Sequence, residues 1–181
     1  MSLNVFITGA SSGIGAALAR EFARRGATLG LVARRKEALD ELIGTLDNSE
    51  KHYAYPCDVT DRDHLIAVGR EFDQITGGAD IVIANAGISV GVKTQYYEDL
   101  DVMEKVYATN VFAMASTFHA FIEPMMGRKR GTLVGIGSVG GIRGMPGTEA
   151  YCSSKSAVIT YCESLRVETV SYTHLRAHET G

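Results

Sequence analysis

The sequence predicts a doubly wound α/β fold, in which helices cover both faces of a parallel sheet. Short apolar runs rich in Val, Ile and Leu alternate with segments of helical periodicity, which is typical of repeated β-α-β units. A glycine-rich turn follows the first apolar run directly. The 181 residues are enough for one core and too few for two, so a single domain is expected to carry the function.

Strands and helices are expected to alternate from the first residues onward. Five strands are expected at residues 3–8, 28–33, 52–55, 81–84 and 132–138, and their short apolar sequences suit strands covered on both faces. Helices are expected at residues 13–25, 36–46, 62–76, 100–126 and 148–168. Gly26 is placed to end the first helix, and Asp61 is placed to cap the third. No repeat or linker interrupts the pattern, so residues 1–168 are expected to form one domain.

The composition favours a small-molecule partner. The chain carries a formal net charge of −3, whereas a surface that binds nucleic acid is usually basic. No apolar run approaches the roughly 20 residues that span a bilayer, and no basic segment precedes the first apolar run. A cytoplasmic protein without a membrane partner is therefore expected. Cys57, Cys152 and Cys162 form no CxxC pair and are expected to be reduced, buried side chains.

A candidate phosphate-binding turn opens the first predicted helix. A glycine-rich backbone between a strand and a helix can approach a pyrophosphate closely, and the helix N-terminus can stabilise its charge. A side chain on the glycines is expected to push the phosphates away. Alone the turn is weak support, because loops often contain glycine for conformational reasons. The residues expected to bind the cofactor here are Thr8, Gly9, Ser11, Ser12, Gly13, Ile14 and Gly15.

Charge at the end of the second predicted strand favours NADP(H) over NAD(H). An acidic residue at this place selects the ribose of NAD, whereas arginine selects the 2′-phosphate of NADP. Arg34 and Arg35 follow the strand and no carboxylate precedes them, so both are expected to bind that phosphate. The alternative is that the two arginines only lie at a solvated helix start.

Four residues form a candidate catalytic group. Tyr151 and Lys155 lie four residues apart on a predicted helix and so share one face. Ser138 ends the fifth predicted strand, and Asn110 lies within the long helix before it. Each alone has an ordinary structural explanation, a strand-end hydroxyl for Ser138 and a helix kink for Asn110. Their combination favours catalysis.

Together these motifs resemble the short-chain dehydrogenase/reductase family. The turn at residues 8–15 matches that family's TGxxxGxG pattern rather than GxGxxG, and the fourth strand runs into its NAG signature. Asn110, Ser138, Tyr151 and Lys155 match its catalytic tetrad in order and context. The resemblance covers residues 3–168. It implies a Rossmann-like sheet with strand order 3-2-1-4-5, from which later strands are missing, and a homo-oligomer for the full-length form.

The resemblance also assigns roles at two strand ends. Asp58 and Val59 match residues that contact the adenine ring, although Asp58 could equally form a turn at the start of a loop. Asn85, Ala86 and Gly87 form the NAG signature, in which the asparagine can pin neighbouring strands by side-chain hydrogen bonds. The glycine leaves room for the cofactor.

Hydride transfer between NADP(H) and a carbonyl or alcohol explains the residue types of the tetrad. During reduction the carbonyl oxygen gains negative charge and needs a proton donor. Tyr151 is the expected acid or base, and a neighbouring Lys155 ammonium favours its phenolate. By resemblance, Lys155 also binds the nicotinamide ribose, Ser138 binds the substrate oxygen, and Asn110 positions a water that connects Lys155 to solvent.

The substrate and two other functional interpretations stay open. The loop at residues 140–147 is expected to border the substrate pocket, with Ile142 and Met145 as apolar walls. Arg143 meets either an acidic substrate or solvent. A dinucleotide-binding regulator without catalysis is one alternative to an enzyme, and an inactive fragment is the other.

The last residues differ from the rest of the chain. Residues 170–180 resemble the in-frame translation of a sequencing-library adapter joined to a truncated reading frame, so residues 169–181 are expected to be a non-native tail. His174 and His178 are four residues apart, with Glu179 adjacent, but the HExxH pattern and a further ligand are missing, so no metal site is expected. The fifth strand is then expected to be an uncovered sheet edge.

Overall fold

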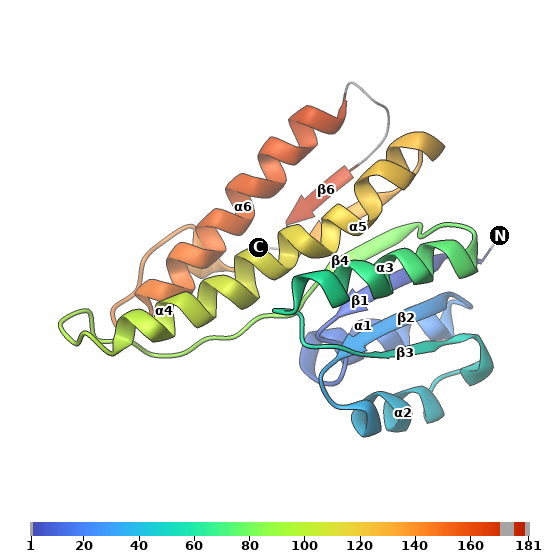
Figure 1. Ribbon diagram of the computed structural model, residues 1–181, viewed down its shortest axis with the longest axis horizontal. Helices are drawn as coiled ribbons and strands as arrows, with labels where there is room; N and C mark the ends of the chain where they lie inside the picture. The colour runs from blue at the N-terminus through green and yellow to red at the C-terminus, as the bar shows by residue number, and fades with distance from the viewer. Residues whose placement is uncertain (1, 171–175, 180–181) are drawn as a thin grey trace.

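A parallel sheet lies at the centre of the computed structural model, which describes residues 2–170 and 176–179 (Figure 1). The sheet order is β3-β2-β1-β4-β5-β6. Every neighbouring pair is parallel, so the carboxyl ends of all the strands meet at one edge. The strands are β1 (Asn4–Thr8), β2 (Thr28–Ala33), β3 (Tyr53–Pro56), β4 (Ile81–Ala84), β5 (Thr132–Gly135) and β6 (Arg176–Glu179).

The predicted order of the first five strands is confirmed, but the expectation that β5 is an uncovered edge is wrong. β6 comes from the segment expected to be a tail, and it pairs with β5 along the whole of that strand. β5 is therefore not an uncovered edge, because the backbone of β6 completes its hydrogen-bond ladder. The remaining tail residues, 171–175 and 180–181, including His174, lie outside the described part of the chain, and so do the side chains of β6.

Alternation along the central strands supplies one core on each face of the sheet. Val5 and Ile7 of β1 pack with α1 (Gly13–Arg24) and α2 (Lys36–Gly44). Phe6, between them, points to the opposite face, because successive strand side chains alternate in direction. That face is covered by α3 (Arg62–Thr76), α5 (Ala113–Arg128) and α6 (Glu149–Val170) (Figure 1).

The predicted ends of two helices are confirmed. Gly26 follows the C-cap of α1 with a φ of +80°, a left-handed conformation that glycine adopts without a steric penalty. The Asp61 side chain caps α3 by accepting a hydrogen bond from the backbone N–H of His64 at 3.2 Å. The three cysteines are buried, as predicted.

Two predicted elements differ from the structure near the candidate site. The helix expected at residues 100–126 consists of α4 (Asp99–Tyr107), a π-helix η2 (Ala108–Phe112) and α5 in direct succession. β5 ends at Gly135, three residues before the predicted end at Ser138. Just beyond this end, the Ile136 N–H still bonds the Ala84 carbonyl of β4 at 3.3 Å, and the Ile136 carbonyl accepts a hydrogen bond from Lys155 Nζ.

The sheet order fixes where a ligand can bind. The chain moves outward from β1 to β3 and then returns to the other side of β1 as β4, so the loops after β1 and β4 leave the sheet in opposite directions. Open parallel sheets bind ligands in the crevice at such a reversal, beyond the carboxyl ends of the strands. Among the described helices, none is long and apolar enough to span a membrane.

Replacing Gly30 should destabilise the core. A Cβ at this β2 position would lie 2.7 Å from Phe72 Cδ2 and 2.8 Å from Phe6 Cδ2, inside van der Waals contact. We expect Gly30→Ala to lower the free energy of unfolding by about 1–3 kcal/mol, as measured by urea denaturation. Gly44→Ala is the control, because a Cβ at this helix end meets no atom within 4 Å. Equal stability of the two variants would contradict the packing argument.

Candidate functional site

The glycine turn is shaped by contacts of the chain with itself. Gly9 has a φ of +66°, and a Cβ there would lie 2.8 Å from the Cα of Ala86. A Cβ at Gly15 would lie 2.3 Å from the carbonyl oxygen of Gly9. These two glycines are therefore required because α1 and the end of β4 pack against the turn. That their missing side chains also make room for phosphates stays a prediction.

Gly13 and the start of α1 fit a phosphate group. Gly13 has a φ of +54°, and a Cβ there would meet no atom within 4 Å. Ser12 is the N-cap but its side chain makes no capping hydrogen bond, and the first turn of α1 has no acidic residue. The N-terminus of α1 thus presents its positive end without a competing carboxylate, as an anion-binding helix does.

Asn85 fastens the end of β4 to the turn. Its Nδ2 donates hydrogen bonds to the carbonyl oxygens of Thr8 at 3.0 Å and of Gly9 at 3.1 Å. The buried hydroxyl of Thr8 accepts hydrogen bonds from the backbone N–H groups of Asn85 and Ala86, both at 3.1 Å. The predicted pinning of neighbouring strands by Asn85 is present in this geometry.

A cavity of about 690 Å³ lies over these strand ends. It has the size of a small-molecule or cofactor site. Most of the residues predicted to bind a cofactor line it. Those that do not are Thr8, Gly15, Arg35, Tyr151 and Lys155. The lining residues are Gly9, Ser11, Ser12, Gly13, Ile14, Ala33, Arg34, Cys57, Asp58, Val59, Thr60, Asn85, Ala86, Gly87, Ile88, Lys105, Ala108 and Thr109.

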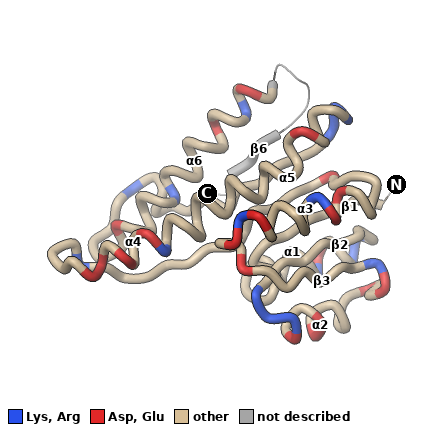
Figure 2. Tube along the Cα trace, viewed as in Figure 1, with Lys and Arg blue, Asp and Glu red and all other residues tan. Residues whose placement is uncertain are grey.

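The two predicted arginines occupy different places. Arg34 lines the cavity, whereas Arg35 is the N-cap residue of α2 and does not, although both are exposed. Figure 2 shows the Lys and Arg residues at the start of α2 in blue. Asp58 also lines the cavity and forms a turn, because its Oδ1 accepts hydrogen bonds from the N–H and hydroxyl of Thr60 at 2.9 and 2.8 Å. These bonds, with the nearby Arg34 charge, hold the pKa of Asp58 below its ordinary value. Asp58 therefore forms the turn at the start of a loop, which was one of the two roles predicted for it.

Asn110 is buried in the π-helix and has three hydrogen bonds. Its Oδ1 accepts from the Ile88 N–H at 2.8 Å, and its Nδ2 donates to the Ile88 carbonyl at 2.9 Å and to Ser154 Oγ at 3.0 Å. The wider π-turn interrupts a long helix at this point, as π-turns often do at functional sites. The amide is thereby fixed against the loop that follows β4.

Lys155 is buried beside the same loop. Its Nζ donates a 2.6 Å hydrogen bond to the Ile136 carbonyl and lies 5.9 Å from the centre of the Tyr151 ring. Burial lowers the pKa of Lys155, because the charged ammonium loses hydration. A Cβ at Gly87 would lie 3.3 Å from Asn110 Oδ1 and 3.6 Å from Lys155 Nζ, so both side chains converge on this glycine.

Ser138 joins this group through the loop after β5. Its Oγ accepts a 3.1 Å hydrogen bond from the N–H of Gly140, so Ser138 caps the start of the short helix η3 (Val139–Gly141). The Tyr151 ring lies against the same glycine, since a Cβ at Gly140 would be 3.3 Å from Tyr151 Cε1. The four residues predicted to be catalytic therefore gather at Gly87 and Gly140, beyond the ends of β4 and β5.

Comparison with known proteins agrees with this arrangement. Residues 3–177 match the family described as short chain dehydrogenase. The chain belongs to the short-chain dehydrogenase family. Epidermal retinol dehydrogenase 2 of Mus musculus is 37% identical over 169 residues, which cover 92% of this chain and 54% of that relative. The chain thus spans about half the length of this relative.

Solved structures share the fold closely. The structure of NAD+-bound xylitol dehydrogenase has a TM-score of 0.91 and 26% identity, over 98% of this short-chain dehydrogenase and 68% of that chain. The structure of ElxO with NADP bound has a TM-score of 0.90 and 26% identity, over 99% and 72% of the respective chains. The two neighbours carry different nicotinamide dinucleotides.

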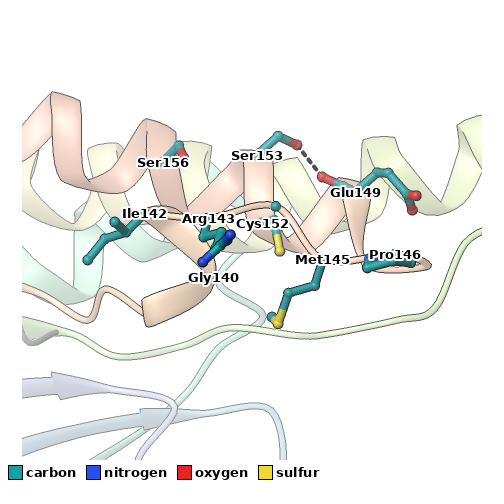
Figure 3. Close-up of a pocket in the computed structure, with 10 residues that line it drawn as sticks. Gly140, Ile142, Arg143, Met145, Pro146, Glu149, Cys152, Ser153 and Ser156 are labelled. Atoms are coloured by element: carbon teal, nitrogen blue, oxygen red, sulfur yellow. Dashed lines mark hydrogen bonds between the residues drawn. The ribbon is translucent and has the colours of Figure 1, made fainter.

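The apolar residues expected to wall the substrate pocket line a second cavity. This cavity, of about 550 Å³, lies between the loop after η3 and α6, and Figure 3 shows Ile142, Arg143 and Met145 along it. Its lining includes Gly140 but not Ser138, Tyr151 or Lys155, which were predicted to be catalytic. The cavity therefore adjoins the predicted catalytic group at Gly140, and these three residues lie outside its lining.

Some polar residues at the site were not predicted, among them Lys105 and Ser154. Lys105 lines the large cavity from α4, and no salt bridge engages it within the described residues. Its spacing from Ala108 and Thr109 places all three on one helix face, which is a signal that the sequence contains. Ser154 bonds Asn110 from α6, and only the folded structure brings these two residues together. In the described part of the chain, no cluster of His, Cys, Asp and Glu could hold a metal ion.

Removing the buried Lys155 ammonium should change how stability depends on pH. Folding lowers the pKa of Lys155, so between the lowered and the ordinary pKa the unfolded chain binds more protons than the folded chain. In this pH window the free energy of unfolding of the wild type therefore rises with pH. We expect the stability of Lys155→Met relative to wild type to fall steadily as pH rises through this window, as measured by urea denaturation at several pH values. The exposed Lys51→Met control should show a constant difference, and a constant difference for Lys155→Met would contradict the burial argument.

Proposed function

We propose that this short-chain dehydrogenase transfers hydride between NADP(H) and a carbonyl or alcohol. The observation that carries the proposal is the convergence of Asn110 and Lys155 on Gly87, with the Tyr151 ring beside Lys155. Gly87 itself lines the cavity that contains the glycine turn. A proton donor and a buried cation therefore adjoin a cleft of the size and composition that a dinucleotide needs.

The cofactor supplies or accepts the hydride, and the residues of the chain manage the proton and the charge. The Tyr151 hydroxyl protonates the carbonyl oxygen during reduction and removes the alcohol proton during oxidation. The Lys155 ammonium stabilises the phenolate that this transfer leaves, and its effect is strong because Lys155 is buried. The Ser138 hydroxyl donates a hydrogen bond to the substrate oxygen, and Asn110 holds the loop after β4 in place.

The cleft fits the two ends of the dinucleotide differently. Gly13 and the N-terminus of α1 receive the pyrophosphate, because this helix end has open space and no acidic side chain. Arg34 receives the 2′-phosphate of the adenosine ribose, which favours NADP(H) over NAD(H). Arg35 does not line the cleft and has no part in this contact. Cys57 is an uncharged part of the lining, since burial raises the pKa of its thiol to about 11.

Replacing Tyr151 should abolish turnover while cofactor binding is kept. We expect Tyr151→Phe to reduce kcat by at least about a hundredfold, because the proton donor is removed and the ring is kept. The measurement is NADPH oxidation with a panel of aliphatic and aromatic ketones and aldehydes, alongside NADPH binding by calorimetry. Exposed Tyr97→Phe is the matched control. NADPH binding by wild type without turnover of any carbonyl would favour a dinucleotide-binding regulator.

Replacing Arg34 should alter the preference between the two cofactors. We expect Arg34→Gln to weaken NADPH binding by about tenfold or more, because a charge-assisted phosphate contact is lost. NADH binding should change by less than about threefold, since NADH has no 2′-phosphate. Arg35→Gln is the control, and it should leave both affinities unchanged. A parallel loss of NADPH affinity in both variants would contradict the assignment.

Lys105 should contribute to the binding of both cofactors. Its ammonium lines the cleft from α4 and has no carboxylate partner in the described structure, so it attracts the pyrophosphate that both dinucleotides share. We expect Lys105→Gln to weaken NADPH and NADH binding by a similar factor of about three, with a smaller salt dependence than wild type. The control is Lys51→Gln, because Lys51 is exposed and precedes β3, at the end of that strand away from the cleft. Unchanged affinities for both cofactors would refute this contribution.

A further inference from the structure

Ser154 occupies an unusual place between the two catalytic residues of α6. It lies between Tyr151 and Lys155 in the sequence, and its side chain is completely buried. Its Oγ accepts a 3.0 Å hydrogen bond from Asn110 Nδ2 and donates a 2.7 Å hydrogen bond to the Tyr151 carbonyl. The hydroxyl therefore connects the π-helix to the backbone of the catalytic helix.

The direction of these hydrogen bonds is determined by the groups around Asn110. The Ile88 N–H can only donate, so the atom of the Asn110 amide that faces it must be Oδ1. The amide nitrogen then donates both of its hydrogens, one to the Ile88 carbonyl and one to Ser154. Ser154 acts as the acceptor, and its own hydrogen goes to the Tyr151 carbonyl. One arrangement satisfies every partner.

Neighbouring serines on the same helix lack this connection. Ser153 Oγ donates to the carbonyl oxygens of Glu149 and Ala150 within α6, and the first of these bonds is drawn in Figure 3. Ser156 Oγ donates to the Gly141 carbonyl, in the loop before α6. Of the three, Ser154 is the one that bonds a side chain of the catalytic group.

We propose that Ser154 is a positioning residue, which fixes the Asn110 amide and thereby the arrangement of Asn110 and Lys155 at Gly87. This inference rests on the proposed function. Asn110 Oδ1 and Lys155 Nζ converge on Gly87 only while the amide keeps its orientation. Loss of the Ser154 hydroxyl leaves a buried Asn110 N–H without its acceptor, and the amide then loses the bond that holds it to α6. Small displacements of catalytic groups reduce rates strongly.

Kinetics of Ser154→Ala test this role. We expect kcat for the best carbonyl of the panel to fall by about tenfold while the KM for NADPH changes by less than about twofold, because positioning is lost and the cofactor cleft is kept. Ser164→Ala, at an exposed serine farther along α6, is the control and should retain wild-type kcat. In an Asn110→Ala background, Ser154→Ala should cause no further loss, since the two residues act through one bond. An unchanged kcat, or independent losses that multiply, would overturn the proposal.

A second measurement needs no turnover and separates this inference from the proposed function. In the wild-type chain and in Ser153→Ala, we expect the Asn110 side-chain amide protons to be protected from solvent exchange by NMR. In Ser154→Ala, that protection should drop by at least about tenfold, because one acceptor is gone. Equal protection in all three proteins would overturn the positioning role. If the wild type turns over no carbonyl but the protection of the Asn110 amide still depends on Ser154, the proposed reaction is rejected. The positioning of Asn110 by Ser154 is then retained.

Discussion

The arrangement of the site depends on the close approach of the turn after β1 to the end of β4. Gly9 and Gly15 allow the approach, because a Cβ at either position would overlap backbone atoms. The Asn85 amide then holds the two segments together through the carbonyl groups of Thr8 and Gly9. One contact thus places the start of α1 next to Gly87, and with it the proposed phosphate end of the cleft next to the proposed catalytic end.

Most of the fold could be predicted because its signals are local. β2 and β4 begin and end where apolar runs bounded by turn residues predict, and α3 ends at Gly77, whose φ of +73° suits glycine. The π-turn could not be predicted, since it differs from an α-helix only in hydrogen-bond register. β6 could not be predicted either, because its backbone pairing with β5 does not require an apolar sequence.

The candidate site was predictable where the sequence itself carries the spacing. Tyr151 and Lys155 are one helical turn apart, and their proximity follows from that fact alone. The different places of Arg34 and Arg35 depend on the direction in which each side chain leaves the β2–α2 junction. The contact of Ser154 with Asn110 joins residues 44 positions apart and exists only after α6 packs beside the π-helix. A polar contact between residues so far apart produces no periodic pattern in the sequence, so it cannot be predicted from one.

The π-turn also constrains the length of the helix that contains it. Each residue of an α-helix rotates the following side chains by about 100°, so an inserted residue reorients every face beyond it. Lys105 before the π-turn and Ala108 at its start face the cleft. Phe112 at its end is exposed, and Ala113 and Met114 after it face the core. Deletion of one residue here would give a more regular helix and swap buried for exposed positions along half of it. The number of residues in this segment therefore matters to the fold independently of their type.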